Sequence, residues 1–242
     1  MERAYPRLAG VLLDVGGTLW PERWPDPAGD AALRVTRLRE VLPALDATRG
    51  AALVADLERR AATLGGATTQ DTGALIGDAL RAAGLPDADP EAVRAAICLP
   101  APGRVDFFPG ARDLLAALRD RGLGVAIVSN AVWRGGADYA RDFAGLGATG
   151  AVAAFVSSVD VGYRKPHRAL FAAALAALGR GSGACAMVGN AEANDVAPAL
   201  ALGLRAIRVA IEEPRPAASA AHAVATSLAE VAAVVDELMA ES

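Results

Sequence analysis

The side chains best suited to chemistry lie in short polar segments that are far apart in the sequence. The first is Asp14, which ends the apolar run of residues 8–13 and is followed by Gly16 and Gly17. Such a pattern is typical of a strand buried on both faces whose chain then turns sharply. In open parallel sheets the ligand crevice lies outside the carboxyl ends of the strands, so Asp14 is placed to meet a substrate. A carboxylate that only caps the turn would produce the same pattern.

A second candidate is a lysine. Of the 24 Lys and Arg residues in the chain, Lys165 is the single lysine, and it stands before Pro166. A chain that otherwise uses arginine for positive charge keeps an ammonium at one place, which indicates that this position needs one. The alternative is a surface lysine that occurs there by chance.

Polar residues also end two later apolar runs. The run 124–128 is followed by Ser129 and Asn130, and the run 184–188 is followed by Gly189 and Asn190. Because these runs alternate with helical patterns, we expect right-handed crossovers and a parallel sheet covered by helices on both faces. The polar strand ends then share one edge of the sheet and one crevice.

The elements that position these residues form an α/β fold, a doubly wound parallel sheet. Besides the strands already named, the pattern predicts a strand over 151–156 and a last strand around 206–209. Helices are expected between the strands and at the end of the chain, over 111–121, 137–143, the segment after Pro166, 196–202 and 228–239.

Residues 21–102 differ from the rest, because they show helical spacing and no strand pattern. We expect about four helices there, the last with Asp89 as N-cap and Pro90 at the first helical position. The domain prediction is therefore a helical insert over 21–102 and a core formed by 1–20 and 103–242. We expect Trp20 and Trp24 to pack where the insert meets the core, with direct substrate contact as the alternative.

Composition narrows the classes of protein. The 242 residues are 53% apolar, enough for a large core. The net charge of −4 and the lack of basic clusters argue against a nucleic-acid partner. No stretch approaches the roughly 20 apolar residues of a membrane span. We therefore expect a cytoplasmic protein with a small-molecule substrate and two free buried thiols, Cys98 and Cys185. Nothing in the sequence specifies an oligomeric state.

The polar segments together resemble a known family. The four segments Asp14-Val15-Gly16-Gly17-Thr18-Leu19, Val128-Ser129-Asn130, Lys165-Pro166 and Val188-Gly189-Asn190-Ala191-Glu192-Ala193-Asn194-Asp195 are similar to the four ordered motifs of the haloacid dehalogenase-like (HAD) superfamily. The helical insert matches the position of that superfamily's C1-type cap. The resemblance implies a Rossmann-like core and a hydrolase.

The resemblance also implies roles for individual residues. Asp14 matches the nucleophile that attacks phosphorus, or carbon in dehalogenases, and forms a covalent aspartyl intermediate. Thr18 and Ser129 match the hydroxyls that orient the nucleophile and bind the transferring group. Lys165 matches the cation that offsets negative charge, a role in which an ammonium and a guanidinium are not interchangeable. The implied phosphate-binding positions are Gly17, Ser129, Asn130 and Lys165.

The same resemblance implies a magnesium site at Asp14, Gly16, Asn190 and Asp195, although two of these positions depart from the phosphatase pattern. Gly16 stands where phosphatases have a second Asp, the general acid, and Asn190 stands where they have a direct Mg²⁺ ligand. A glycine cannot transfer a proton, and general acid–base catalysis is worth about 10² to 10⁴ in rate. An Asn oxygen can coordinate Mg²⁺, but the site loses a negative charge.

Three hypotheses about function follow. The first is a Mg²⁺-assisted phosphatase for a small phosphorylated metabolite, either impaired or rescued by another acid such as Glu22, Asp26 or Glu192. The second is a metal-independent hydrolase of the dehalogenase kind, in which halide leaves without a proton; those enzymes usually carry Tyr at the position of Gly16. The third is a protein that keeps the fold and binds a phosphorylated ligand or a partner. The prevalence of phosphatases in the family favours the first. The retention of Asp14, Thr18, Ser129, Lys165 and Asp195 argues against a complete loss of activity, as in the third.

Overall fold

A six-stranded sheet in which every pairing is parallel forms the centre of the computed structural model, which describes residues 5–66 and 69–240. The strand order is β3-β2-β1-β4-β5-β6, so β1 is central. This confirms the predicted doubly wound α/β fold. The strands are β1 (Gly10–Leu13), β2 (Gly124–Ser129), β3 (Ala154–Ser157), β4 (Cys185–Gly189), β5 (Arg205–Val209) and β6 (Ala223–Ala225).

Two strand predictions were wrong in detail. The run 206–209 is not the last strand, because β6 pairs in parallel beyond it. With only three residues, β6 is too short to show a periodic pattern. The strand expected over 151–156 begins at Ala154, which pairs with Ala126 of β2. Apolar composition does not mark where pairing begins, and so the boundary was misplaced by three residues.

Helices cover both faces of the sheet. Successive side chains of a strand point to opposite faces, so apolar residues at consecutive positions need cover on both. In β1, Val11 and Leu13 pack into one cluster and Leu12 into the other. The first cluster includes side chains of α5 (Ala111–Asp120), α6 (Gly136–Gly145) and α10 (Leu228–Ala240), and the second includes those of α8 (Arg168–Leu178) and α9 (Ala197–Ala201). Shorter elements are α7 (Ser158–Val161), the 3₁₀ turn η2 (Ser182–Ala184) and the π-helical turn η3 (Glu192–Val196).

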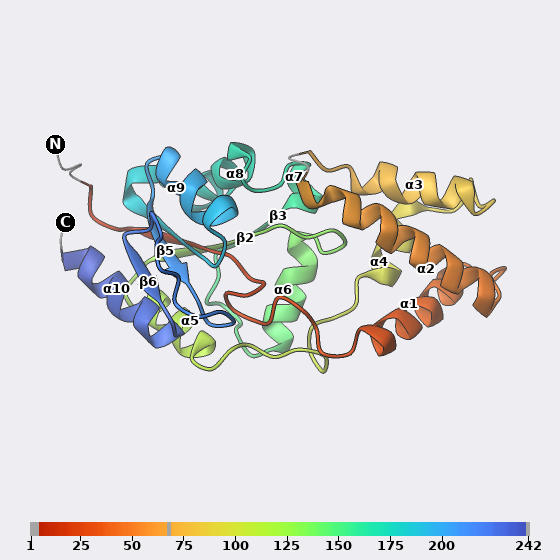
Figure 1. Cartoon of the computed structure of the whole chain (residues 1–242), viewed down its shortest axis with the longest axis horizontal. Helices are drawn as coiled ribbons and strands as arrows, with labels where there is room; N and C mark the ends of the chain where they lie inside the picture. The colour runs from red at the N-terminus through yellow and green to blue at the C-terminus, as the bar shows by residue number, and fades with distance from the viewer. Residues whose placement is uncertain (1–4, 67–68, 241–242) are drawn as a thin grey trace.

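The predicted insert contains four α-helices with a hydrophobic cluster of their own. They are α1 (Pro27–Val41), α2 (Ala47–Ala62), α3 (Thr72–Ala82) and α4 (Pro90–Ile97), and the 3₁₀ turn η1 (Thr63–Gly66) follows α2. The side chain of Asp89 accepts a hydrogen bond from Glu91 N, as expected of an N-cap. These helices, here called the cap, lie at one end of the elongated molecule, and both termini lie towards the other (Figure 1). The exact division at residues 20 and 102 stays a prediction, and residues 1–4 lie outside the described chain.

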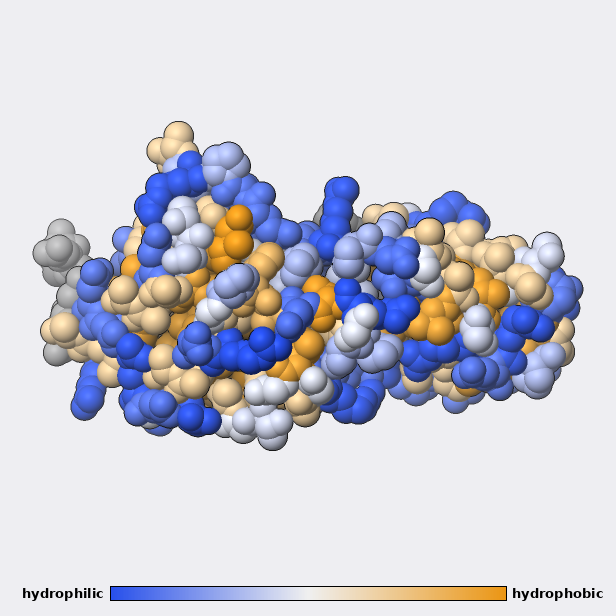
Figure 2. Space-filling view, turned by 90° about the horizontal axis from the view of Figure 1, so that it is seen from below, coloured by the Kyte–Doolittle hydropathy of each residue, from blue (hydrophilic) through white to orange (hydrophobic). Residues whose placement is uncertain are grey.

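Seen from below, the cap and the sheet-containing part present one continuous surface along the long axis of the molecule, with polar and hydrophobic residues on both (Figure 2). Trp20 lies inside the larger part, only 4% exposed, and stacks on Phe107 and Tyr139. Trp24 packs against the guanidinium of Arg134. None of the helices in the described part of the chain is long and apolar enough to cross a membrane.

The loop between β2 and α6 is held by the cap along three successive carbonyls. Gln70 Nε2 donates to Ala131 O at 2.8 Å, and Thr72 Oγ1 donates to Val132 O at 3.2 Å. The guanidinium of Arg94, on α4, donates to the carbonyl of Trp133. Because the same loop begins at the end of β2, the cap is attached next to the polar edge of the sheet.

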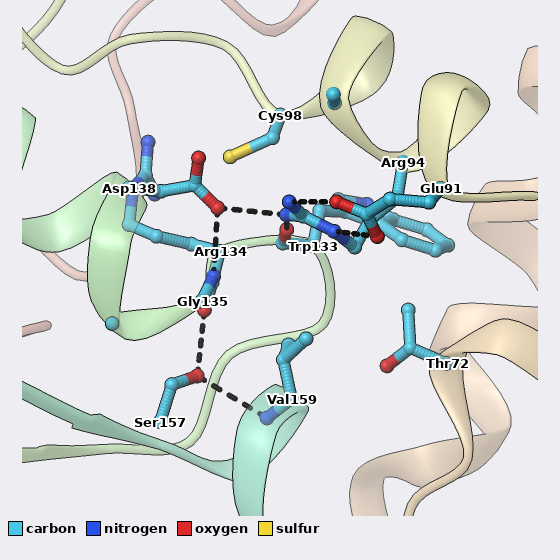
Figure 3. A network of polar contacts seen from close by, with 12 residues as sticks. Thr72, Glu91, Arg94, Cys98, Trp133, Arg134, Gly135, Asp138, Ser157 and Val159 are labelled. Carbon is cyan, nitrogen blue, oxygen red and sulfur yellow. Dashed lines mark hydrogen bonds and ion pairs between the residues drawn. The ribbon is translucent and has the colours of Figure 1, made fainter.

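Arg94 is the centre of this attachment (Figure 3). It bonds Asp138 of α6 at 2.7 Å, while Glu91 binds its other nitrogens. Asp138 also accepts from Gly135 N at 2.9 Å, so it fixes the start of α6. Burial alone would raise the pKa of Asp138, but the Gly135 N–H and the Arg94 guanidinium together hold it below its usual value.

We predict that Arg94→Ala lowers the free energy of unfolding by about 1 to 3 kcal/mol, because it leaves the buried carboxylate of Asp138 with one partner fewer. The matched control is Arg81→Ala on α3, which removes an exposed pair with Asp78 and should cost roughly 0.5 kcal/mol or less. Urea unfolding monitored by circular dichroism measures both. Equal losses for the two variants would contradict the attachment described above.

Candidate active site

The polar strand ends meet in a cavity of about 190 Å³ at the carboxyl edge of the sheet. Asp14 follows β1, Ser129 ends β2, and Asn190 follows β4. The parallel register of these three strands brings them to one edge, as predicted. The cavity is lined by Asp14, Gly16, Glu22, Ser129, Asn130, Lys165, Asn190, Ala191, Asn194 and Asp195.

Lys165 lies between two carboxylates. Its Nζ is 2.6 Å from Asp14 Oδ1 and 2.7 Å from Asp195 Oδ1, and all three residues are buried. Burial alone would lower the pKa of Lys165, but Asp14 and Asp195 more than offset that effect and raise it. The ammonium is therefore charged throughout the physiological range and directly compensates the carboxylate of Asp14.

The π-helical turn η3 positions Asp195. The second carboxylate oxygen, Oδ2, accepts the Ala191 N–H at 2.9 Å, so both oxygens of Asp195 have partners. Burial raises the pKa of this carboxyl, and Lys165 opposes that rise. Asp195 thus orients Lys165 rather than facing the cavity with a free oxygen.

Asn130 and Lys165 are linked through the main chain. Asn130 Oδ1 accepts from Lys165 N at 2.7 Å, and Asn130 Nδ2 donates to Lys165 O at 3.0 Å. This two-point contact fixes the backbone that carries the ammonium. Asn130 was predicted as a phosphate-binding residue, and the structure shows that its amide positions the lysine.

The two predicted hydroxyls have different surroundings. Thr18 Oγ1 lies 3.4 Å from Asp14 Oδ2, a long contact that leaves this oxygen lightly held. Ser129 Oγ is 2.7 Å from the hydroxyl of Tyr139, a residue that the sequence analysis missed. Burial raises the pKa of Tyr139 to about 12, so it stays neutral. Its place on α6 showed only as one apolar helix position, with no signal for a polar role.

The turn after Asp14 presents two main-chain N–H groups. Gly17 N donates to Trp20 O, and Thr18 N donates to Val15 O, closing the turn. Within the described chain, the N–H groups of Val15 and Gly16 donate to no other protein atom. Val15 is buried and Gly16 is half-buried in the cavity wall, so this pair of donors is available to an anion beside Asp14. Gly17 has φ of 68°, which explains why a glycine closes the turn.

Three acids were considered as replacements for the one missing at Gly16, and only Glu22 lines this cavity. A Cβ on Gly16 would lie 2.7 Å from Glu22 Oε2. Asp26 instead caps α1 through Gly29 N. Glu192 accepts from Ser219 Oγ and Ala220 N, away from the cavity.

The four positions at which the resemblance implied magnesium ligands do not fit a resident ion. Gly16 has no side chain, Asn190 contributes no charge, and both oxygens of Asp195 are used. The position between Asp14 and Asp195 is taken by Lys165, so among these four positions only Asp14 Oδ2 is a carboxylate oxygen that neither the lysine nor a main-chain N–H binds. Among residues 5–66 and 69–240, no three Asp, Glu, His or Cys side chains are grouped as metal ligands. Hard divalent cations depend on such carboxylates.

A larger cavity of about 600 Å³ continues from the small one towards the cap. The two share Gly16, Glu22, Ser129 and Asn130. The wall on the cap side includes Trp24, Arg34, Ile97, Cys98 and Leu99. A space of this size suits a small-molecule substrate whose reacting group reaches Asp14.

Comparisons with known proteins, by sequence and by fold, support the resemblance to the haloacid dehalogenase-like superfamily. The family model for the haloacid dehalogenase-like hydrolases matches residues 8–203, and no curated protein matches the sequence. A HAD phosphatase from Thermococcus onnurineus has a similar structure, with TM-score 0.63 and 20% identity over 94% of this chain and 98% of that one. So does a 2-haloacid dehalogenase from Pseudomonas syringae pv. Tomato DC3000, with TM-score 0.63 and 22% identity over 96% and 98%.

The HAD-hydrolase YfnB from Bacillus subtilis, solved bound to magnesium, is also similar, with TM-score 0.58 and 18% identity over 96% of this chain and 100% of that one. At these identities the structural likeness shows the fold, and the family model covers most of the sequence. The chain belongs to the haloacid dehalogenase-like hydrolases.

Proposed function

We propose that the chain hydrolyses phosphate monoesters of small metabolites through a covalent aspartyl phosphate on Asp14. The observation that carries the proposal is the carboxylate of Asp14, held by the buried Lys165 at 2.6 Å beside the two free N–H groups of Val15 and Gly16. A nucleophile, a fixed cation and main-chain donors then converge on one transferring group.

In the first step Asp14 attacks the phosphorus of the bound ester. Lys165 holds Oδ1, so the lightly held Oδ2 is the attacking oxygen. A new Oδ2–P bond forms while the bond from phosphorus to the ester oxygen breaks. Lys165 and the free N–H groups stabilise the charge on the phosphoryl oxygens, and the alcohol part of the ester occupies the larger cavity.

In the second step water attacks the phosphorus of the aspartyl phosphate. The Oδ2–P bond breaks, inorganic phosphate leaves, and the carboxylate of Asp14 is restored. The Asp195 carboxylate keeps Lys165 in place through both steps, because its other oxygen is fixed to Ala191 N.

Two observations favour a phosphatase over the alternatives. Glu22 lines the cavity and offers an ionisable group, which a leaving ester oxygen needs as a proton donor and a departing halide does not. A protein that only bound an anionic ligand would gain nothing from Asp14 next to the anion site, since that carboxylate repels the ligand. A nucleophile explains its position.

We predict that Asp14→Asn abolishes turnover of aryl phosphates and leaves folding intact, because the amide keeps the shape of the carboxylate and loses its nucleophilicity. Intact mass spectrometry after rapid acid quench should show a phosphorylated wild-type protein and an unmodified variant. Asp236→Asn, at an exposed pair with Arg121, is the matched control and should retain full activity. Wild-type activity in Asp14→Asn would refute the nucleophile.

We predict that Lys165→Arg lowers kcat/KM nearly as far as Lys165→Ala, because a planar fork does not fit the space of an ammonium held by two carboxylates. Lys165→Ala leaves two buried carboxylates without their cation, and removing one partner of a buried pair costs about 3 to 5 kcal/mol. Rates are therefore measured at a temperature where circular dichroism shows each variant to be folded. An Arg variant as active as wild type would mean that charge alone matters here.

We predict that removing divalent cations with EDTA lowers kcat/KM by less than about tenfold, because the donors around Asp14 do not form a resident Mg²⁺ site. The measurement is a titration with EDTA followed by added Mg²⁺, at constant ionic strength. A complete and reversible loss of activity would show that the substrate brings a required ion into the site.

A further inference from the structure

Glu22 occupies the space that a side chain at position 16 would fill. Its Oε2 is 2.7 Å from where a Cβ on Gly16 would lie, closer than two such atoms approach. The residue two positions after Asp14 has no side chain, and the carboxyl group of Glu22, six residues further along, occupies the space beside it. The cavity therefore lacks an acid at position 16 and has the carboxyl group of Glu22 next to that position.

The backbone of the turn delivers Glu22 to this position. Trp20 N donates to Val15 O, and Gly17 N donates to Trp20 O, so the chain folds back over Gly16 before residue 22. The N–H of Glu22 then donates to Glu212 Oε2 at 3.0 Å, which ties the segment to the loop after β5. The main chain that carries Glu22 is thus held by local and long-range contacts.

Glu22 also lies at the border of the two cavities. It lines the small cavity with Asp14 and Lys165, and the large one with Trp24 and Arg34. An ester whose phosphoryl group meets Asp14 and whose alcohol part extends towards the cap must place its bridging oxygen at this border. Although the residue as a whole is exposed, its Oε2 lies beside Gly16, which lines both cavities.

We propose, on the basis of the phosphatase function above, that Glu22 is the general acid and base of the reaction. As Asp14 attacks, the carboxylic acid of Glu22 gives its proton to the ester oxygen while the P–O bond breaks, so that a neutral alcohol leaves. The resulting carboxylate then takes a proton from the attacking water as the Oδ2–P bond breaks. Phosphate is released with Glu22 protonated again.

The surroundings of Glu22 support this role. Burial, then Asp14, then Glu212 raise the pKa of its carboxyl, while Lys165 and Arg23 act in the opposite direction. A raised pKa favours the protonated acid that the first step requires, and the carboxylate needed later forms only after proton transfer.

The test compares two esters that differ in their need for an acid. Nitrophenolate leaves phosphorus without a proton far more readily than phenolate does. We expect Glu22→Gln to lower kcat/KM for phenyl phosphate by about 10² or more, and for p-nitrophenyl phosphate by less than about tenfold. Because the second step still needs a base, the variant should show a burst of nitrophenol and retain phosphate on Asp14, detected by intact mass.

A double variant that moves the carboxyl group from position 22 to position 16 tests whether the lost activity can be restored. Glu22→Ala combined with Gly16→Asp places a carboxyl group in the vacated space and should recover part of the phenyl phosphate rate that Glu22→Ala loses. Gly16→Asp alone should be no better than wild type, since its side chain would meet Glu22 Oε2. Glu213→Gln, on the same loop as Glu212 and paired with Arg208, is the control and should keep the wild-type rates.

The outcomes separate the two proposals. Equal losses on both esters, or no loss on either, with Asp14-dependent activity intact, would refute the role of Glu22 and leave the phosphatase standing. No Asp14-dependent hydrolysis of either ester by the wild-type chain would refute both. A burst without rescue by the double variant would show that Glu22 acts in the second step alone and would overturn its assignment as the acid.

Discussion

The ammonium of Lys165 between Asp14 and Asp195 is the interaction on which the rest of the site depends. It joins three segments that are far apart in the sequence: the end of β1, the turn η3 and the segment before α8. Taking three charges out of water is costly, and only close geometry and further hydrogen bonds compensate. Those bonds are present, since Asn130 fixes the main chain of the lysine and Ala191 N holds the far oxygen of Asp195.

The sequence patterns predicted that these polar residues lie together because, in a parallel sheet, the carboxyl ends of neighbouring strands lie at the same edge. Once β1, β2 and β4 are adjacent and in register, Asp14, Ser129 and Asn190 must lie together. The residue types at strand ends were therefore enough to locate the cavity. The single lysine in a chain rich in arginine located its cation.

The parts that sequence could not predict depend on loop paths and on single contacts. Glu22 was one of three acids that the sequence analysis named as possible replacements for the acid missing at Gly16. No sequence pattern distinguishes it from Asp26, because its position depends on the hydrogen bonds of one tight turn. The hydroxyl of Tyr139 contacts Ser129 from a helix that the sequence analysis predicted only by its range. Likewise β6 was too short to show a strand pattern.

The departures from the phosphatase pattern are coupled through charge. A carboxylate at position 16 would lie near the carboxyl group of Glu22, and two carboxylates that share a site cannot both ionise without cost. A further carboxylate at Asn190 would add to the negative charge around Asp14 that Lys165 alone now compensates. With Gly16 and Asn190, the cavity holds three carboxyl groups and one ammonium rather than five carboxyl groups, and Glu22 is the proton donor in the proposal above. The site is altered as a unit, which argues for retained chemistry and against random loss of single residues.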